Sequence, residues 1–246
     1  MKKVFCVIIS VCLIFALTSC FSKKNTTEIT TSETSTTLDD QQGYISPLEE
    51  MESDTLQYPS KNSEWMYNVY NTFVEITAYI GKDDKTNIIV PGEIDTLPVK
   101  SFCAKLPRNV KSVKLPDTLV IISNLSGGWC SELEKINLPD SLIEIGEETF
   151  YGCDKLTNIS IPINVEKIGI EAFRGCDLKS ITIPKSVKTV DSAAFFDCRM
   201  KEVTILNPEM TFDDSNLYCE TLYGYIGSTA AHYASEHSLN FKPIKE

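Results

Sequence analysis

The segment from Val113 to Ile205 repeats itself about every 23 residues, and this repeat constrains the fold more than any other feature of the chain. Prolines recur at intervals of 23, 23 and 22 residues, cysteines recur with the same spacing, and a phenylalanine precedes three of the cysteines by three residues. These residues are Pro116, Pro139, Pro162 and Pro184, then Cys130, Cys153, Cys176 and Cys198, and Phe150, Phe173 and Phe195. Such a period predicts a β-rich solenoid, in which each coil covers the apolar face of its neighbour.

A short alternating segment precedes each proline. The four segments are Val113-Lys114-Leu115, Ile136-Asn137-Leu138, Ile159-Ser160-Ile161 and Ile181-Thr182-Ile183. Alternation predicts a strand with its aliphatic side chains on one face, and proline ends such a strand because it cannot donate to the ladder. Gly146 and Gly169 follow at positions that suit a sharp turn.

The polar residues of these segments predict two columns across the stacked strands. The first column contains Ser112, Lys135, Asn158, Ser180 and Glu202, and the second contains Lys114, Asn137, Ser160, Thr182 and Thr204. With strands about 4.8 Å apart, five coils present a strip roughly 20 Å long. The strip is polar and mostly uncharged, and these ten residues are the candidate partner-binding residues. The competing interpretation is that they are solvated positions on a sheet.

The repeat, written strand-Pro-x-x-[LV]-x-x-I-G-x-x-[AT]-F-x-x-C, resembles the BspA-type leucine-rich repeat family. The resemblance extends to Ile88-Ile89-Val90-Pro91, which is similar to a first coil, and to the segment from Leu222 to Ala230, which is similar to a C-terminal end. It implies a right-handed, leucine-rich-repeat-like stack of about five to six coils with a short C-terminal capping helix. Two units depart from the pattern: Gly127 stands where phenylalanine is expected, with Trp129 beside it, and Asp191 replaces the turn glycine.

The expected domain runs over residues 63–246. Residues 63–100 form an N-terminal cap, in which 66–80 alternate well enough for a hairpin or strand. Residues 101–216 carry the repeats, and 217–246 form the C-terminal cap. Ser228 or Thr229 can N-cap a helix that runs to about His237.

Residues 1–19 have the pattern of a secretory signal, with basic residues at 2–3 and an apolar stretch at 4–17 that is short for a membrane span. The following Leu17-Thr18-Ser19-Cys20 resembles a bacterial lipobox, which implies lipid attachment at Cys20. An ordinary signal peptide and an uncleaved anchor helix are the alternatives. Residues 20–62 contain a run of Thr, Ser and Glu that cannot bury enough surface to offset chain entropy, so we expect a disordered tether.

Six of the nine cysteines remain when Cys6, Cys12 and Cys20 are set aside. An even number in an exported chain is compatible with a disulfide framework. Four of the six are in register with the repeat, however, which favours reduced thiols packed as small buried apolar groups. Because stacked coils bring these thiols close together, one or two bridges remain compatible with the pattern.

The composition excludes some classes of partner and offers little chemistry. The net charge of −11, without a basic stripe, is unfavourable for nucleic-acid binding. His232 and His237 are five residues apart, which is not same-face spacing on a helix, and no nucleophile-elbow, phosphate-loop or zinc-protease motif occurs. We therefore expect no enzymatic activity, no cofactor and no metal.

The order of signal, tether and solenoid predicts an exported module that is anchored by lipid at the bacterial cell surface. The family resemblance implies adhesion to a protein of a host or neighbouring cell, and a glycan is an alternative partner. The competing hypothesis is a passive structural or shielding component of the envelope, without a specific ligand.

Overall fold

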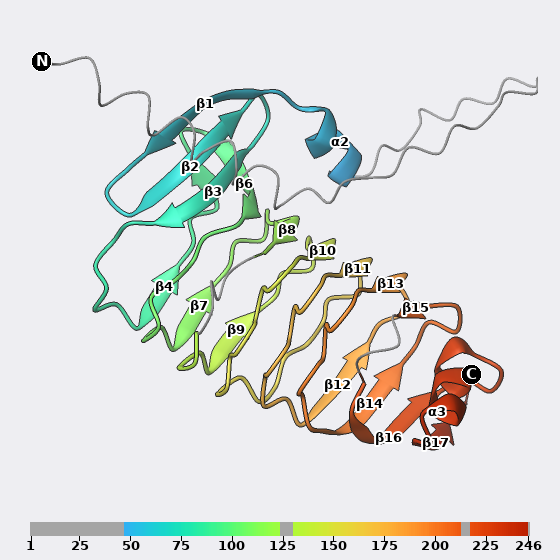
Figure 1. The fold of residues 1–246 in the computed structure, drawn as a ribbon. Helices are drawn as coiled ribbons and strands as arrows, with labels where there is room; N and C mark the ends of the chain where they lie inside the picture. Colours follow the sequence, from blue (N-terminus) through green and yellow to red (C-terminus); the bar gives the residue numbers. More distant parts are fainter. Residues whose placement is uncertain (1–46, 124–129, 213–216, 246) are drawn as a thin grey trace, which may run out of the picture.

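The computed structural model describes residues 47–123, 130–212 and 217–245. These residues form a solenoid of about seven turns that ends in a short helix, which confirms the predicted fold (Figure 1). The stack is longer than the five to six coils that the repeat alone indicates, because the flanking segments add turns at both ends.

One flank of the solenoid is a ten-stranded sheet. It begins with three antiparallel strands, β1 to β3, and continues as a parallel ladder of short strands, while β5 pairs with β6 at its side. The strands are β1 (Leu56–Lys61), β2 (Trp65–Tyr70), β3 (Val74–Tyr79), β5 (Glu93–Ile94), β6 (Leu97–Phe102), β8 (Ile121–Ile122), β10 (Glu144–Ile145), β11 (Lys167–Ile168), β13 (Thr189–Val190) and β15 (Thr211–Phe212).

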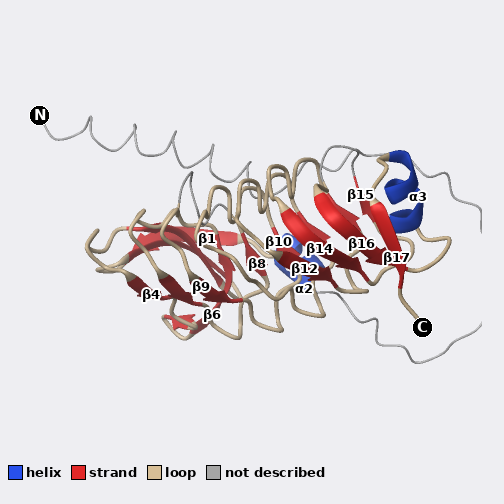
Figure 2. Ribbon diagram, turned by 90° about the horizontal axis from the view of Figure 1, so that it is seen from below, coloured by secondary structure: helices blue, strands red, loops and turns tan. Residues whose placement is uncertain are grey.

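The opposite flank consists of two separate parallel sheets that lie in one row along the molecule (Figure 2). The first contains β4 (Asn87–Ile89), β7 (Ser112–Lys114) and β9 (Lys135–Asn137). The second contains β12 (Ser180–Ile183), β14 (Met200–Ile205), β16 (Cys219–Gly224) and β17 (Asn240–Pro243). Equivalent residues of neighbouring coils pair directly, since Val113 lies opposite Ile136 and Ile181 lies opposite Val203.

A continuous apolar core runs along the axis between the two flanks. On the turn side of each coil, the rings of Phe150, Phe173 and Phe195 stack with centroids 5.1 and 5.2 Å apart, and all three are fully buried. The sequence-based expectation that equivalent aromatic side chains share one interior is therefore confirmed. Coil-on-coil stacking buries each ring between its neighbours instead of in a separate pocket.

The repeat cysteines are buried in the same interior, and among the described residues their thiols form no disulfide bonds. The Cys176 Sγ donates a hydrogen bond to the Phe150 carbonyl at 3.0 Å, and the Cys198 Sγ donates to the Phe173 carbonyl at 2.9 Å. Burial raises the pKa of both thiols, and the neighbouring repeat thiol contributes in the same direction. The thiols thus connect one coil to the carbonyl of the coil before it.

The glycines at 146 and 169 do not have the role expected from the sequence. Neither adopts a left-handed φ; the left-handed glycines among the described residues are Gly152, Gly175 and Gly227. A Cβ on Gly169 would instead lie 2.7 Å from the Gly146 carbonyl carbon. Close approach of successive backbones, and not turn conformation, therefore explains glycine at 169.

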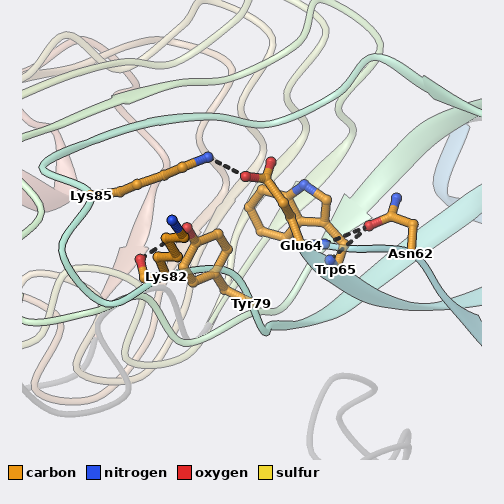
Figure 3. A network of polar contacts seen from close by, with 6 residues as sticks. All are labelled: Asn62, Glu64, Trp65, Tyr79, Lys82 and Lys85. Atoms are coloured by element: carbon orange, nitrogen blue, oxygen red, sulfur yellow. Dashed lines mark hydrogen bonds and ion pairs between the residues drawn. The ribbon is translucent and has the colours of Figure 1, made fainter.

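The N-terminal cap closes the first coil with the antiparallel strands β2 and β3, which confirms the expected hairpin. Trp65 is buried at its centre, with its ring 5.0 Å from Tyr79 and 5.8 Å from Phe102 in edge-to-face contacts. The turn before β2 is held by the Asn62 Oδ1, which accepts hydrogen bonds from the backbone N–H groups of Glu64 and Trp65, both at 2.9 Å (Figure 3). Lys85 forms an ion pair with Glu64, which attaches the following loop to this turn.

Residues 47–61 contain a helix and a strand, so the prediction of a disordered tether up to residue 62 is wrong for this part of the chain. Helix α2 (Pro47–Ser53) packs Met51 into a small cluster with Tyr70, Phe73, Val120 and Ile121, and β1 pairs with β2. The Asp54 carboxylate accepts hydrogen bonds from the backbone and hydroxyl of Thr72, at 2.9 and 2.6 Å. Burial alone would raise the pKa of Asp54, but hydrogen bonds from Thr72, Thr55 and Asn71 outweigh it and lower the pKa to about 2.

The C-terminal cap is helix α3 (Thr229–Glu236), in the place the sequence predicts. The Ser228 hydroxyl accepts a hydrogen bond from the Ala231 N–H at 3.2 Å, which caps the helix, and His237 ends it. Buried Ala230, Tyr233 and Ala234 join the core at this end of the stack. The expected signal at 1–19, the lipid site Cys20, the tether up to residue 46 and Trp129 lie outside the described residues.

Candidate functional site

The predicted polar strip lies on the flank with the two separate sheets. Ser112 and Lys114 lie on β7, Lys135 and Asn137 on β9, Ser180 and Thr182 on β12, and Glu202 and Thr204 on β14. Both columns have the expected register, since Ser112 pairs with Lys135 and Lys114 with Asn137, and Ser180 pairs with Glu202 and Thr182 with Thr204. Their neighbours Val113, Ile181 and Val203 point into the core, so alternation directs the polar side chains outward.

Asn158 and Ser160 are exposed as expected, but they do not lie on a strand. The first sheet ends at β9 and the second begins at β12, so strand pairing is interrupted at the coil that carries these two residues (Figure 1). A backbone hydrogen bond from Lys179 N–H to the Thr157 carbonyl, 3.2 Å long, still attaches this coil to the following one. The interruption therefore opens toward β9.

A hollow of about 390 Å³ occupies this interruption, and we call it the notch. It is lined by Ile136, Asn137, Leu138, Asp140, Asn158, Ile159, Ser160 and Pro162. Ile136 and Ile159 are only partly buried, whereas Val113 and Ile181, their equivalents in flanking coils, are 4 % exposed. The notch therefore combines two amides, a hydroxyl and a carboxylate with an accessible aliphatic floor.

The strip extends further in both directions than the sequence prediction. In the ladder, Asn87 and Ile89 precede Ser112 and Lys114, while Thr221 and Tyr223 follow Glu202 and Thr204. The Tyr223 hydroxyl donates to the Glu202 Oε1 at 3.2 Å. These residues could have been found by aligning the first coil and the C-terminal segment to the repeat, because both end in a similar strand.

The sheet on the other flank has a different surface. Its outward row contains charges that neutralise one another: Lys167 Nζ lies 3.6 Å from the Glu144 carboxylate and 3.4 Å from that of Asp191. Burial raises the pKa of Glu144, and Lys167 partly offsets this. Helix α2 covers the N-terminal part of this flank, beside a hollow of about 510 Å³ that includes Glu50 and Lys100. The open, mostly uncharged strip is the better candidate for a contact surface.

Neither the strip nor the notch has the features of a catalytic or metal site. Among the described residues, no group of three or more His, Cys, Asp or Glu side chains is arranged to hold a metal ion. His232 lies on α3 with its Nε2 3.3 Å from the Glu236 carboxylate. In the part of the chain that the structure describes, no helix is long and apolar enough to cross a membrane. What the strip offers chemically is hydrogen bonding and apolar contact.

A family model described as the BspA type leucine-rich repeat region matches residues 72–202 in six copies. The chain belongs to this family. The matched repeats of this BspA-type protein are coils of the solenoid described above, which is a protein-interaction or surface repeat module. No curated protein matches the sequence.

Several solved structures of bacterial leucine-rich repeat proteins share the fold of this BspA-type chain. The Treponema pallidum leucine-rich repeat protein is 24 % identical, with a TM-score of 0.54 over 76 % of this chain and 98 % of its own. The pneumococcal vaccine antigen PcpA is 21 % identical, with a TM-score of 0.54 over 75 % of this chain and 49 % of its own. A leucine-rich cell surface protein from Faecalibacterium prausnitzii is 22 % identical, with a TM-score of 0.50 over 63 % of this chain and 50 % of its own.

Proposed function

We propose that the protein is a lipid-anchored recognition module of the bacterial cell surface that binds a protein partner through the polar strip. The observation that carries this proposal is the notch at the centre of the strip, where Asn137, Asn158 and Ser160 surround accessible Ile136 and Ile159. Contact sites that combine an apolar centre with a polar rim are typical of protein interfaces. A passive surface does not require such a notch.

Anchoring and location are part of the same proposal. The apolar stretch at 4–17 and the lipobox-like Leu17 to Cys20 support export and acylation at Cys20. The Faecalibacterium protein with a similar fold is a cell surface protein, which supports the same location. The partner is a protein of a host cell or a neighbouring bacterium, and a glycan is the alternative outcome of the test.

A binding screen with substituted strips tests this proposal. The purified chain is applied to arrays of extracellular-matrix proteins, bacterial surface proteins and glycans, together with Asn158→Arg and Ser160→Arg. We expect a saturable partner whose affinity falls about tenfold or more when a bulky charge enters the notch, as for a central contact residue. Lys185→Glu, on the exposed turn after Pro184, is the matched control and should bind normally.

The competing hypothesis of a passive envelope component makes the opposite predictions. It expects no saturable ligand on any array and full tolerance of both notch variants. A partner that binds the two variants and the wild type equally would show that the strip is not the contact surface, even if the protein is a receptor.

A further inference from the structure

A second regular surface lies on the turn side of the solenoid, away from the polar strip. Tyr151, Arg174, Phe196 and Tyr218 occupy equivalent positions in four successive coils, spaced 23, 22 and 22 residues apart. We call these four residues the turn ladder. Aromatic and arginine side chains are the types most enriched at the energetic centres of protein interfaces.

The members of the turn ladder contact one another in chain order. The Arg174 guanidinium lies 5.6 Å from the ring centroid of Tyr151 and 5.1 Å from that of Phe196, so it is placed between the two rings. The Phe196 and Tyr218 rings meet edge to face, with centroids 6.3 Å apart. The Glu171 carboxylate, 2.5 Å from Arg174, holds the guanidinium in this position.

The backbone beneath the ladder is rigidly connected. Gly152 N–H donates to the Arg174 carbonyl at 2.8 Å, and Gly175 N–H donates to the Phe196 carbonyl at 2.9 Å. Directly below, the buried Phe150, Phe173 and Phe195 rings are stacked. The side chains of the turn ladder are therefore held in place before a partner binds, which lowers the entropy cost of binding.

The core does not need this row of exposed rings. Phe196 is 37 % exposed and Tyr218 is 60 % exposed, while the Arg174 side chain is 36 % exposed. Single exposed apolar residues are ordinary, but a contiguous row is not. Three turn segments around it, 147–154, 170–177 and 192–199, carry six carboxylates against two guanidinium groups. Glu171 pairs with Arg174 and Asp177 pairs with Lys179, so the acidic excess comes from the other four carboxylates. The surroundings of the ladder thus favour a cationic partner.

The spacing of the rungs indicates the conformation of that partner. Coils repeat at about 4.8 Å, so members of the turn ladder that are two coils apart are separated by about 9.6 Å. A polyproline II segment repeats every three residues, or about 9.3 Å, whereas same-face residues of a β-strand repeat at about 6.6 Å. Proline-rich segments also dock on aromatic-lined surfaces because their backbone is already ordered.

We propose that the turn ladder binds an extended, proline-rich segment of a partner protein that carries lysine or arginine side chains. Prolines three residues apart contact the rings of Tyr151 and Phe196, which are alternate members of the ladder, and Tyr218 extends the aromatic surface beside Phe196. The basic side chains lie near the surrounding carboxylates, among them Glu148 and Asp197. This surface is separate from the polar strip and can be occupied independently of it.

Two labelled peptides of equal length and charge test the proposal by fluorescence anisotropy with the full chain: four repeats of Pro-Pro-Lys and four repeats of Gly-Gly-Lys. We expect the proline peptide to bind about tenfold tighter or more, and Tyr218→Ala and Phe196→Ala each to weaken it about fivefold or more. Tyr223→Ala, an aromatic of the opposite flank, is the matched control. Because Tyr218 is largely exposed, Tyr218→Ala retains the fold, which circular dichroism checks.

Equal binding of the two peptides would overturn the proposal, because the contact would then be electrostatic only. Unchanged binding by the double variant of Phe196 and Tyr218, or no binding of the proline peptide, would also overturn it. Sedimentation that shows a dimer abolished by Tyr218→Ala would assign the ladder to a second copy instead. Asn158→Arg should leave peptide binding unchanged, so failure here is distinguishable from failure of the strip.

Discussion

The replacement Gly169→Ala tests whether the coils stack backbone on backbone. The added Cβ would lie 2.7 Å from the Gly146 carbonyl carbon and 2.8 Å from the Glu147 nitrogen. Carbon atoms in favourable contact are about 3.5–4.0 Å apart, so the coils must separate by several tenths of an ångström or more. Both opposing atoms belong to the backbone, and no side-chain rotation can relieve the contact.

The expected cost follows from two opposing effects. Overpacking in a well-packed interior costs about 1–3 kcal/mol, and contact with two backbone atoms places Gly169→Ala at the upper end. The lower entropy of an unfolded chain with alanine offsets about 0.4–1 kcal/mol. We expect the free energy of unfolding to fall by about 2 kcal/mol, measured by urea denaturation followed by circular dichroism, with an unchanged dependence on urea.

Gly227→Ala is the control, because Gly227 has a φ of +76° and a Cβ there meets no atom within 4 Å. Only the left-handed conformation opposes alanine at this position, at about 1–2 kcal/mol before the same entropic offset. If Gly169→Ala costs no more than Gly227→Ala, the close approach of the two coils at this position is refuted.

Three further predictions concern single side chains. Asp197 adopts a left-handed φ of 60° at the position that Gly175 occupies in the preceding coil. Asp197→Gly should therefore increase the free energy of unfolding by about 0.5 kcal/mol, measured as a higher melting temperature. Burial raises the pKa of Glu75 above 4.5, only partly offset by hydrogen bonds from Asn68, Ser101 and Tyr70, so its ionisation disfavours folding. Glu75→Gln should therefore be more stable than wild type at pH 7, with this advantage vanishing below pH 4.5 in urea titrations. The pKa of Asp54 is lowered from 3.8 to about 2, so its ionised carboxylate stabilises the fold above pH 3.8 and this stabilisation is lost as the pH falls toward 2. Amide hydrogen exchange of residues 47–55 should therefore increase as the pH falls over that range. The same increase is expected at neutral pH in Asp54→Ala.

Much of the fold follows from the period of the sequence. The positions of Phe150, Phe173 and Phe195 predict a shared interior because only direct stacking brings residues 23 apart into contact. The N-cap at Ser228 is likewise a local signal that needs no tertiary information. These features were predictable because each coil, or each helix end, repeats the same physical requirement.

Other features depend on packing that a local pattern does not record. The segment Asn158-Ile159-Ser160 alternates as well as its neighbours, yet it forms no strand, so the notch could not be read from it. Strand β1 is exposed along almost its whole length and has no apolar alternation that would distinguish it from a tether. Glycine at 169 was recognisable as periodic, but a turn and a close backbone approach require the same residue, and only the structure separates them.

The way the chain enters the domain has a mechanical consequence. Strand β1 is the outermost strand of the ten-stranded sheet, and α2 packs on the side of this sheet against Val120 and Ile121. β1 is attached through an antiparallel pairing whose open end is at Leu56 and Tyr70. A pulling force applied at Pro47 would break the hydrogen bonds between β1 and β2 one after another, starting at the open end of the hairpin. The force would reach the parallel strands of the coils only after that. The strip and the turn ladder would therefore keep their shape while the first two elements yield.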